Sequence, residues 1–291
     1  MRKLWCFEDR KGWGAALMAA ARARGYGGGL FRDASPEIEG PVFIRLDQRE
    51  PDLSHSRRMA EAALAAGARV VPDARMLAHY EDKWAQAAAF APWMPATALI
   101  ESRRAAEAAI GLLALPFVSK SKGGSASKNV RLIKSWRQAD YEIEAVFGEP
   151  GGMAISGGLQ AGYLIWQEFC AGNAYDYRLI INGRRYLMLR RYNRRERPFA
   201  SGSGVAEPVN ELAGEAAGAF EAGAEFFAAN DMRWCGIDLV QQAGRWRVLE
   251  TTIAWTLPAY APCVYHGDPE KRHGSAQWEI LLDELEAGIF G

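Results

Sequence analysis

The chain has 291 residues, 49% of them hydrophobic and 24% charged, which is typical of a folded globular protein with more than one domain. Its 35 basic and 35 acidic residues balance, so no overall field would attract nucleic acid or an anionic membrane. We expect a cytoplasmic protein, because no stretch approaches the roughly 18 apolar residues of a membrane span, the first residues lack the apolar core of a signal peptide, and the four cysteines show no disulfide or zinc-site spacing.

Short apolar runs alternate with alanine-rich runs over the first 75 residues. The apolar runs occupy residues 3–7, 41–46 and 68–72, and helix-forming runs lie between them at 12–25 and 56–67. Strands that alternate with helices favour a small parallel sheet, which we expect to end near Pro72. One helix is expected to follow over residues 73–92, with Asp73 as its N-cap.

Residues 116–133, PFVSKSKGGSASKNVRLI, join two apolar runs through a loop of glycine, serine and lysine. Glycines let backbone N–H groups approach an anion, while serine hydroxyls and lysine charges add donors, so the loop is a candidate phosphate cradle. It lacks the P-loop spacing GxxxxGK[ST], and a flexible, solvated hairpin loop is the alternative. A charged helix is expected at 135–148, followed by a flexible glycine-rich connection at 149–162.

An acidic β-hairpin is predicted near the end of the chain, because CGIDLVQQ and RWRVLETT flank a short glycine-containing turn. With a three-residue loop at 243–245, Asp238 lies opposite Glu250, and Thr252 points to the same face. Opposed carboxylates, about 4.5 to 5.5 Å apart at Cβ, destabilise a strand pair unless a cation neutralises them. Hard oxygen ligands favour Mg²⁺ and, with it, a phosphate ligand. The alternative is a solvent-facing strand pair whose acids have no special role.

The order of six segments carries a family resemblance: YEDKWAQ, PFVSKSKGGSASKNV, IWQEFCAGNAYDYR, RRYN, GIDL and VLETT. In this order they resemble the ATP-grasp superfamily, in the branch of glutathione synthetase and the RimK-like ribosomal-protein glutamate ligases, over residues 42–261. The resemblance implies an α/β ATP-grasp fold in three parts. These are a Rossmann-like N-terminal domain at 1–75, a small lobe with the phosphate loop at 76–162, and a C-terminal lobe with the metal site at 163–291.

The resemblance also implies roles for single residues. Those expected to contact ATP are Lys83, Lys120, Gly123, Gly124, Ser125, Gln167, Glu168, Phe169 and Asp176. The expected Mg²⁺ ligands are Asp238, Glu250 and Thr252, the last of which replaces an asparagine of the family pattern. The expected catalytic residues, which face the transferred phosphoryl group, are Lys120, Arg178 and Arg191.

Strand alternation puts Arg190 and Arg191 on opposite faces, so only one of them can face a cleft, and we expect it to be Arg191. The other arginines of this region, Arg184, Arg185, Arg194 and Arg195, are expected at the solvated surface.

The implied activity is an ATP-dependent ligase that joins a carboxylate to an amine through an acyl phosphate, with ATP, Mg²⁺ and small-molecule or peptide substrates. A phosphotransferase on the same fold is one alternative. Another is an ATP-binding regulatory module without turnover, which Thr252 favours, and a plain scaffold is a third. The identity of the substrates and the oligomeric state, a homo-oligomer included, stay open.

Overall fold

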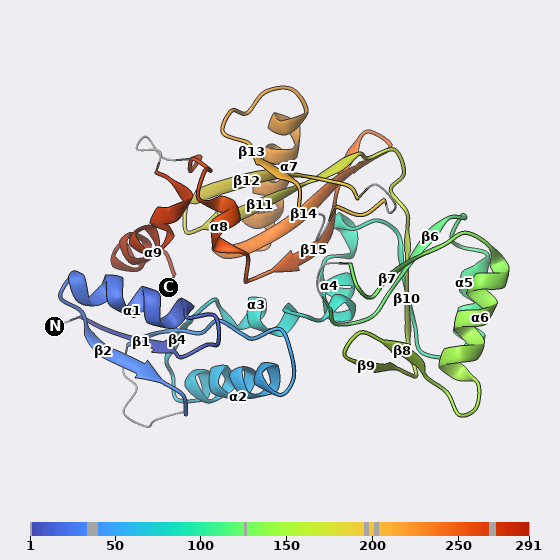
Figure 1. Cartoon of the computed structure of the whole chain (residues 1–291), viewed down its shortest axis with the longest axis horizontal. Coiled ribbons are helices and arrows are strands. Elements are labelled where there is room, and N and C mark those ends of the chain that lie inside the picture. Colours follow the sequence, from blue (N-terminus) through green and yellow to red (C-terminus); the bar gives the residue numbers. More distant parts are fainter. Residues whose placement is uncertain are drawn as a thin grey trace.

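The chain folds around three main sheets in the computed structural model (Figure 1). The structure describes residues 2–33, 40–124, 127–194, 198–200, 204–267 and 272–290. Among the helices described, none combines the length and the apolar character needed to cross a bilayer.

The first sheet is parallel, as predicted, with strand order β2-β1-β3-β4. Its strands are β1 (Lys3–Phe7), β2 (Gly27–Phe31), β3 (Pro41–Phe43) and β4 (Arg69–Val71), and its helices are α1 (Trp13–Ala23) and α2 (Asp52–Ala65). Strand β2 was not predicted, because its sequence GGGLF lacks the β-branched residues typical of strands. Its Gly28 has φ +99°, and a Cβ there would meet the carbonyl oxygen of Leu4 at 2.0 Å.

The prediction of a single helix over residues 73–92 is wrong, because the structure has two helices there. Helix α3 (Ala74–His79) ends before Glu81, whose φ is 53°. The Asp82 carboxylate then accepts hydrogen bonds from the N–H groups of Trp84 and Ala85, at 3.0 Å each. This N-cap starts α4 (Lys83–Ala89), which leads into the short turn η1 (Ala91–Trp93). The break places Lys83 in the first turn of a helix.

The second sheet is antiparallel, with strand order β5-β10-β6-β7. Its elements are β5 (Thr97–Ile100), α5 (Arg103–Ile110), β6 (Phe117–Lys120), β7 (Val130–Ile133), α6 (Trp136–Phe147) and β10 (Leu164–Glu168). The flexible connection expected at 149–162 is instead a hairpin of β8 (Met153–Ile155) and β9 (Gly158–Gln160). Because β10 pairs with β5 and β6, this sheet extends past the predicted boundary at residue 162.

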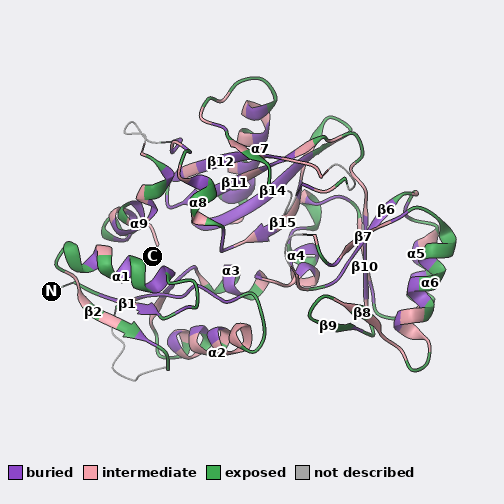
Figure 2. Ribbon diagram, viewed as in Figure 1, coloured by how far each residue is buried: buried purple, intermediate pink, exposed green. Residues whose placement is uncertain are grey.

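The third sheet has strand order β13-β12-β11-β14-β15, and its pairs are antiparallel. Its strands are β11 (Tyr175–Asn182), β12 (Arg185–Tyr192), β13 (Ala206–Pro208), β14 (Trp234–Gln242) and β15 (Arg245–Thr252). The helices of this lobe are α7 (Glu215–Ala229), α8 (Leu257–Tyr260), η2 (Gly274–Ala276) and α9 (Gln277–Glu286). Figure 2 shows that buried residues concentrate in its strands.

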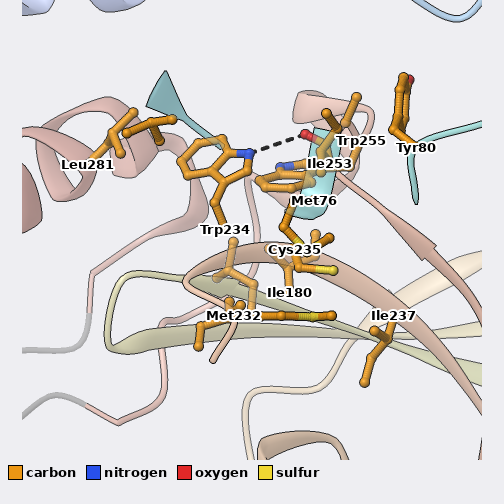
Figure 3. Packing of buried hydrophobic residues seen from close by; sticks show 14 of the residues in the cluster. Met76, Tyr80, Ile180, Met232, Trp234, Cys235, Ile237, Ile253, Trp255 and Leu281 are labelled. Atoms are coloured by element: carbon orange, nitrogen blue, oxygen red, sulfur yellow. Dashed lines mark hydrogen bonds between the residues drawn. The ribbon is translucent and has the colours of Figure 1, made fainter. Parts of the chain in front are cut away.

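Two separate hydrophobic cores lie under these sheets. One core joins the first and third sheets, and Trp13 and Phe43 of the N-terminal domain contact the ring of Trp234 there. The indole of Trp234 also donates to the Ile253 carbonyl at 3.1 Å (Figure 3). The other core lies between the second sheet and helices α5 and α6, around Phe117 and Trp166.

One surface prediction for the arginines is wrong. Arg185 is only 8% exposed, and its guanidinium donates to the fully buried Glu284 at 2.7 Å. Arg184 meets the same acid but keeps its side chain 61% exposed, as expected. Arg195 lies outside the described residues.

Candidate active site

The acidic hairpin has the predicted pairing, but it reaches that pairing by another route. Strands β14 and β15 are joined by a two-residue turn, Ala243 and Gly244, whose φ angles are 47° and 77°. This turn is one residue shorter than predicted and pairs Leu239 with Val248. A β-bulge between Asp238 and Leu239 then adds one residue on β15, so that Asp238 faces Glu250.

Asp238 is neutralised by two arginines. Arg178, its partner across β11 and β14, donates from Nε and Nη2 at 2.6 and 2.7 Å, and Arg191 donates from Nη2 at 2.8 Å. Burial opposes ionisation of this carboxyl, which is 4% exposed, yet the two guanidinium groups hold its pKa well below the usual range. Arg191 also makes two 2.7 Å bonds to Asp176, whose pKa is raised because burial outweighs the attraction of this guanidinium.

Glu250 is neutralised by a different cation. Lys83 Nζ lies 3.1 Å from its Oε1 and also donates to the Gly124 carbonyl at 2.9 Å. Burial alone would lower the pKa of Lys83, but Glu250 and Glu81 outweigh it and raise the pKa. The repulsion expected between Asp238 and Glu250 is therefore relieved by side chains of the protein itself.

Lys120 is a buried cation whose hydrogen-bond acceptors, within the described residues, include no carboxylate. It ends β6 and donates from Nζ to Gln167 Oε1 at 2.6 Å and to the Leu249 carbonyl at 3.3 Å. Burial lowers its pKa to about 8. Neutral acceptors hold this ammonium less firmly than an acid would, so Lys120 is available to an anion that enters the cavity.

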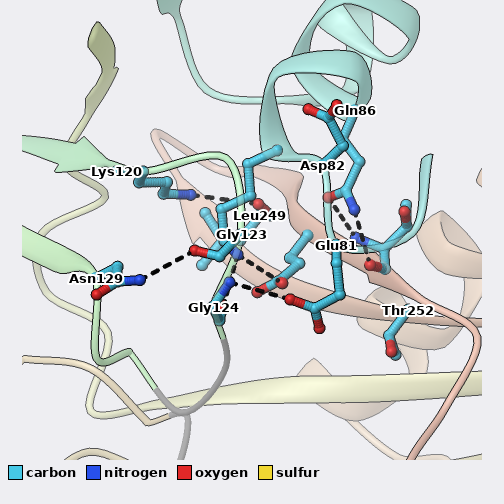
Figure 4. A network of polar contacts seen from close by, with 12 residues as sticks. Glu81, Asp82, Gln86, Lys120, Gly123, Gly124, Asn129, Leu249 and Thr252 are labelled. Carbon is cyan, nitrogen blue, oxygen red and sulfur yellow. Dashed lines mark hydrogen bonds and ion pairs between the residues drawn. The ribbon is translucent and has the colours of Figure 1, made fainter. Parts of the chain in front are cut away.

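The glycine-rich loop is held against this cluster (Figure 4). The Gly124 N–H donates to the Glu81 carboxylate at 3.0 Å, and Asn129 Nδ2 reaches the Gly123 carbonyl at 3.3 Å. Gly124 has φ +111°, and a Cβ on it would lie 2.6 Å from Asn129 Nδ2. Ser125, also expected in this loop, lies outside the described residues.

A narrow cavity lies beside these groups. Its walls combine apolar side chains such as Val118, Phe169 and Leu249 with most of the predicted ATP residues and acids: Lys83, Lys120, Gln167, Glu168, Asp176, Asp238 and Glu250. The volume is ≈ 100 Å³. Ligand pockets usually have about 300–1,000 Å³, so a nucleotide would have to part the two lobes to enter.

A larger chamber of ≈ 650 Å³ adjoins it. Arg178, Arg191, Thr252 and residues of the N-terminal domain line this chamber. Glu250 and Ala200 line both cavities, while Asp238 lines the narrow one. The charged cluster of Asp238, Arg178 and Glu250 thus forms the wall between the two cavities.

Two residues of the site were missed from the sequence. Glu81 holds the glycine-rich loop, but it stood inside an expected helix, and its left-handed backbone is invisible in the sequence. Asn129 binds both Gly123 and the carbonyl of Ser156 in the β8–β9 turn, and this turn was expected to be a flexible connection. The clue available was the short run Tyr80-Glu81-Asp82, in which Asp82 is a good N-cap residue.

Comparison with known proteins decides the fold. No protein-family model and no curated protein matches the chain. Among solved structures, a RimK-domain ATP-grasp protein from Sphaerobacter thermophilus matches with TM-score 0.65 at 15% identity, over 98% of this chain and 99% of that chain. D-alanine–D-alanine ligase from Bacillus anthracis, complexed with ATP, matches with TM-score 0.64 at 12% identity, over 99% and 98%. The chain has the ATP-grasp fold.

A third ATP-grasp structure of this kind is the ligase PsnB complexed with minimal precursor, Mg and ADP, with TM-score 0.62 at 14% identity over 98% of each chain. These likenesses confirm the predicted α/β ATP-grasp fold and the resemblance from which it was inferred. The three-part domain division and the roles of the site residues stay predictions.

The residues of this ATP-grasp chain fit ATP and Mg²⁺ by the chemistry of their donors. Lys83 and Lys120 bring positive charge, which suits phosphate, to a cavity with apolar walls, which suit a base. Asp238 and Glu250 are hard oxygen donors paired across two strands. The third predicted ligand, Thr252, uses its hydroxyl locally, donating to the Ala254 carbonyl at 2.8 Å and accepting from the Ala254 N–H at 3.2 Å. Among the described residues, no three His, Cys, Asp or Glu side chains gather into a metal-binding group.

Proposed function

We propose that this ATP-grasp chain is an ATP-dependent ligase that joins a carboxylate to an amine. One observation carries the proposal: the cluster of Asp238, Arg178 and Glu250 stands between two adjoining cavities. Group transfer needs a donor on one side of such a cluster and an acceptor on the other, held close together. A module that only holds ATP has no use for the larger chamber.

In this proposal each residue of the site has a role. Lys83 and Lys120 bind phosphate oxygens from the narrow cavity, and Arg178 and Arg191 stabilise the negative charge that develops on the transferred group. Asp238 and Glu250 would hold Mg²⁺, with Thr252 as the predicted third ligand, and the ion when bound neutralises phosphate charge.

The proposed reaction has two steps. A carboxylate oxygen attacks the γ-phosphorus of ATP, the bond to the β-phosphate bridging oxygen breaks, and an acyl phosphate and ADP form. An amine nitrogen then attacks the acyl carbon, inorganic phosphate leaves, and the nitrogen loses a proton to give an amide. Neither step needs a nucleophile from the protein, which suits a site built from charged donors.

A screen for ADP release over amino acids, short peptides and small carboxylic acids, followed by mass analysis of the products, tests the proposal. We expect ADP release that depends on both a carboxylate and an amine, and an amide as product. A phosphoester product would instead show a phosphotransferase. ATP binding without ADP release, with every acceptor tried, would show a binding module.

A further inference from the structure

The N-terminal domain supplies one end of the larger chamber with basic side chains. Lys11 follows β1 and Arg45 follows β3, and both line the chamber. Strand β1 has β2 on one side and β3 on the other, so the strand order reverses beside it. In open parallel sheets, ligands bind outside the carboxyl ends of the strands at such a reversal. Lys11 and Arg45 stand at this position.

Arg45 is buried, and the described residues offer its charge no close partner. It is 5% exposed, and its Nη1 lies 3.4 Å from Asp47 Oδ1 and 3.7 Å from Asp9 Oδ1. Charge-assisted hydrogen bonds are usually about 2.7–2.9 Å long, so both contacts are weak. Its Nε has no hydrogen-bond partner within the described part of the chain.

Two other arginines that line the same chamber differ from Arg45, because each is paired with an acid at short distance. Arg178 and Arg191 each grip an acid with two bonds of 2.6 to 2.7 Å. Near Arg45, by contrast, the Asp9 carboxylate accepts from the N–H groups of Lys11 and Gly14 at 2.9 and 2.8 Å. A buried guanidinium left in this state is costly, because its donors lose water and gain little in return. A ligand that carries a planar anion would remove that cost.

Apolar and aromatic side chains form much of the remaining wall. Trp13 lies under Arg45, with the guanidinium carbon 5.2 Å from a ring centroid. Trp255, Leu257, Pro258 and Tyr260 line the chamber as well. A ligand that fits this wall has a hydrophobic body beside its charged group.

We propose that Arg45 binds a carboxylate of the acceptor substrate, and that this substrate has an aromatic or other apolar body. Arg45 lies just after β3 of the first sheet, whereas Arg178 and Arg191 lie on the third sheet. The bound carboxylate therefore lies at the Arg45 end of the chamber, and a second group of the substrate reaches Arg178 and Arg191. The inference deepens the proposed function and rests on it for the identity of the chamber as a substrate site. Arg45 is thus a specificity residue.

The test uses two matched probes and no nucleotide: 3-phenylpropionate and its neutral isostere 3-phenylpropionamide. Binding is followed by the fluorescence of tryptophan, because Trp13 and Trp255 line the chamber. We expect the full chain to bind the carboxylate at least about ten-fold more tightly than the amide, as loss of a charge-assisted bidentate pair implies. Arg45→Gln should abolish this preference, and Arg45→Lys should retain part of it.

Arg32→Gln is the matched control, since Arg32 lies in the same domain with its side chain 72% exposed. It should keep the preference. Equal binding of the two probes by the wild type, failure of both to bind at millimolar concentration, or an unchanged preference in Arg45→Gln would each overturn the proposal. Because the test contains no ATP, a failed ADP-release screen would leave its result standing, and the reverse also holds.

Discussion

Asp238 holds two arginines at once, and this determines what its substitution does. The sequence suggested that removing its charge would relieve a repulsion with Glu250. The structure corrects this expectation, because Asp238→Asn leaves Arg178 and Arg191 with less negative charge in a buried cluster. Breaking a buried ion pair costs about 3–5 kcal/mol.

We therefore predict that Asp238→Asn lowers the free energy of unfolding by about 3–5 kcal/mol. It should also reduce ADP release at least about 100-fold, as loss of a charged group in a preorganised site does. Chemical denaturation and the ADP assay measure the two effects. Asp231→Asn is the control, because Asp231 is an exposed acid of the same lobe with φ 49°, a conformation that asparagine accepts. Wild-type turnover in Asp238→Asn would remove the cluster from the active site.

The lowered pKa of Lys120 leads us to predict that the protein takes up a proton when ATP binds. Its pKa is lowered to about 8 by burial, so above that pH the nucleotide-free protein holds a neutral amine. Phosphate charge favours the ammonium and raises the pKa toward the ordinary lysine value of about 10.4. At any pH between these two pKa values, ATP binding should therefore be accompanied by uptake of a proton.

Calorimetry near pH 9, in two buffers of different ionisation enthalpy, measures this uptake; the pH lies between the pKa of about 8 and the ordinary value of about 10.4. Lys120→Met should bind ATP at least about ten-fold more weakly, without proton uptake. Lys122→Met, at a neighbouring exposed lysine, should keep the uptake. No uptake in the wild type would show that Lys120 does not meet the phosphates.

At the scale of an element, the glycine-rich loop is held by the break between α3 and α4. Glu81 accepts a hydrogen bond from the Gly124 N–H, and Lys83 donates one to the Gly124 carbonyl. Both backbone groups of Gly124 are therefore bound by side chains from this break. We predict that Glu81→Ala speeds hydrogen exchange of the Gly124 amide at least about ten-fold, because that N–H loses its acceptor. Amide exchange in β6 should stay unchanged. NMR measures the exchange rates, and Glu101→Ala, at an exposed acid, is the control. Equal exchange rates of the Gly124 amide in the wild type and in Glu81→Ala would show that Glu81 does not hold the loop.

At the scale of the whole molecule, the two cores predict two units of stability. The first and third sheets share one core, whereas the second sheet forms its own core with α5 and α6, and within its described residues only the half-buried Leu99 of β5 packs on the first core. The narrow cavity lies where the second and third sheets meet, with Val118 from one and Val240 from the other. We therefore expect the two cores to respond separately to substitutions.

We predict that Trp166→Ala, which costs about 3–5 kcal/mol for a buried tryptophan, loosens only the small lobe. Trp234→Ala should instead loosen the N-terminal domain together with the C-terminal lobe, because Trp234 contacts Trp13 and Phe43. Hydrogen exchange with mass spectrometry distinguishes the two variants. Exchange should become faster in peptides of β6 and β7 in Trp166→Ala, and in peptides of β1 and β14 in Trp234→Ala. A uniform rise in exchange over the whole chain in Trp166→Ala would contradict the division.

Local patterns in the sequence were enough to predict three of the four strands of the first parallel sheet and the strands on either side of the glycine-rich loop. The Asp238–Glu250 pair was predicted correctly only because a bulge offsets a turn that is one residue shorter than expected. Periodicity and turn residues act over a few neighbours, so one sequence contains their signals. The order of motifs was enough to predict the ATP-grasp fold.

The tertiary structure decided the rest. The bulge beside Leu239, the left-handed Glu81 and the two-residue turn at Ala243 depend on how the strands pack, which no local pattern states. Arg45 joins the chamber only because the first sheet docks on the third through a shared core. Long-range packing sets which charges meet. It pairs Asp238 with two arginines, and it leaves Arg45 without a close partner for its charge among the described residues.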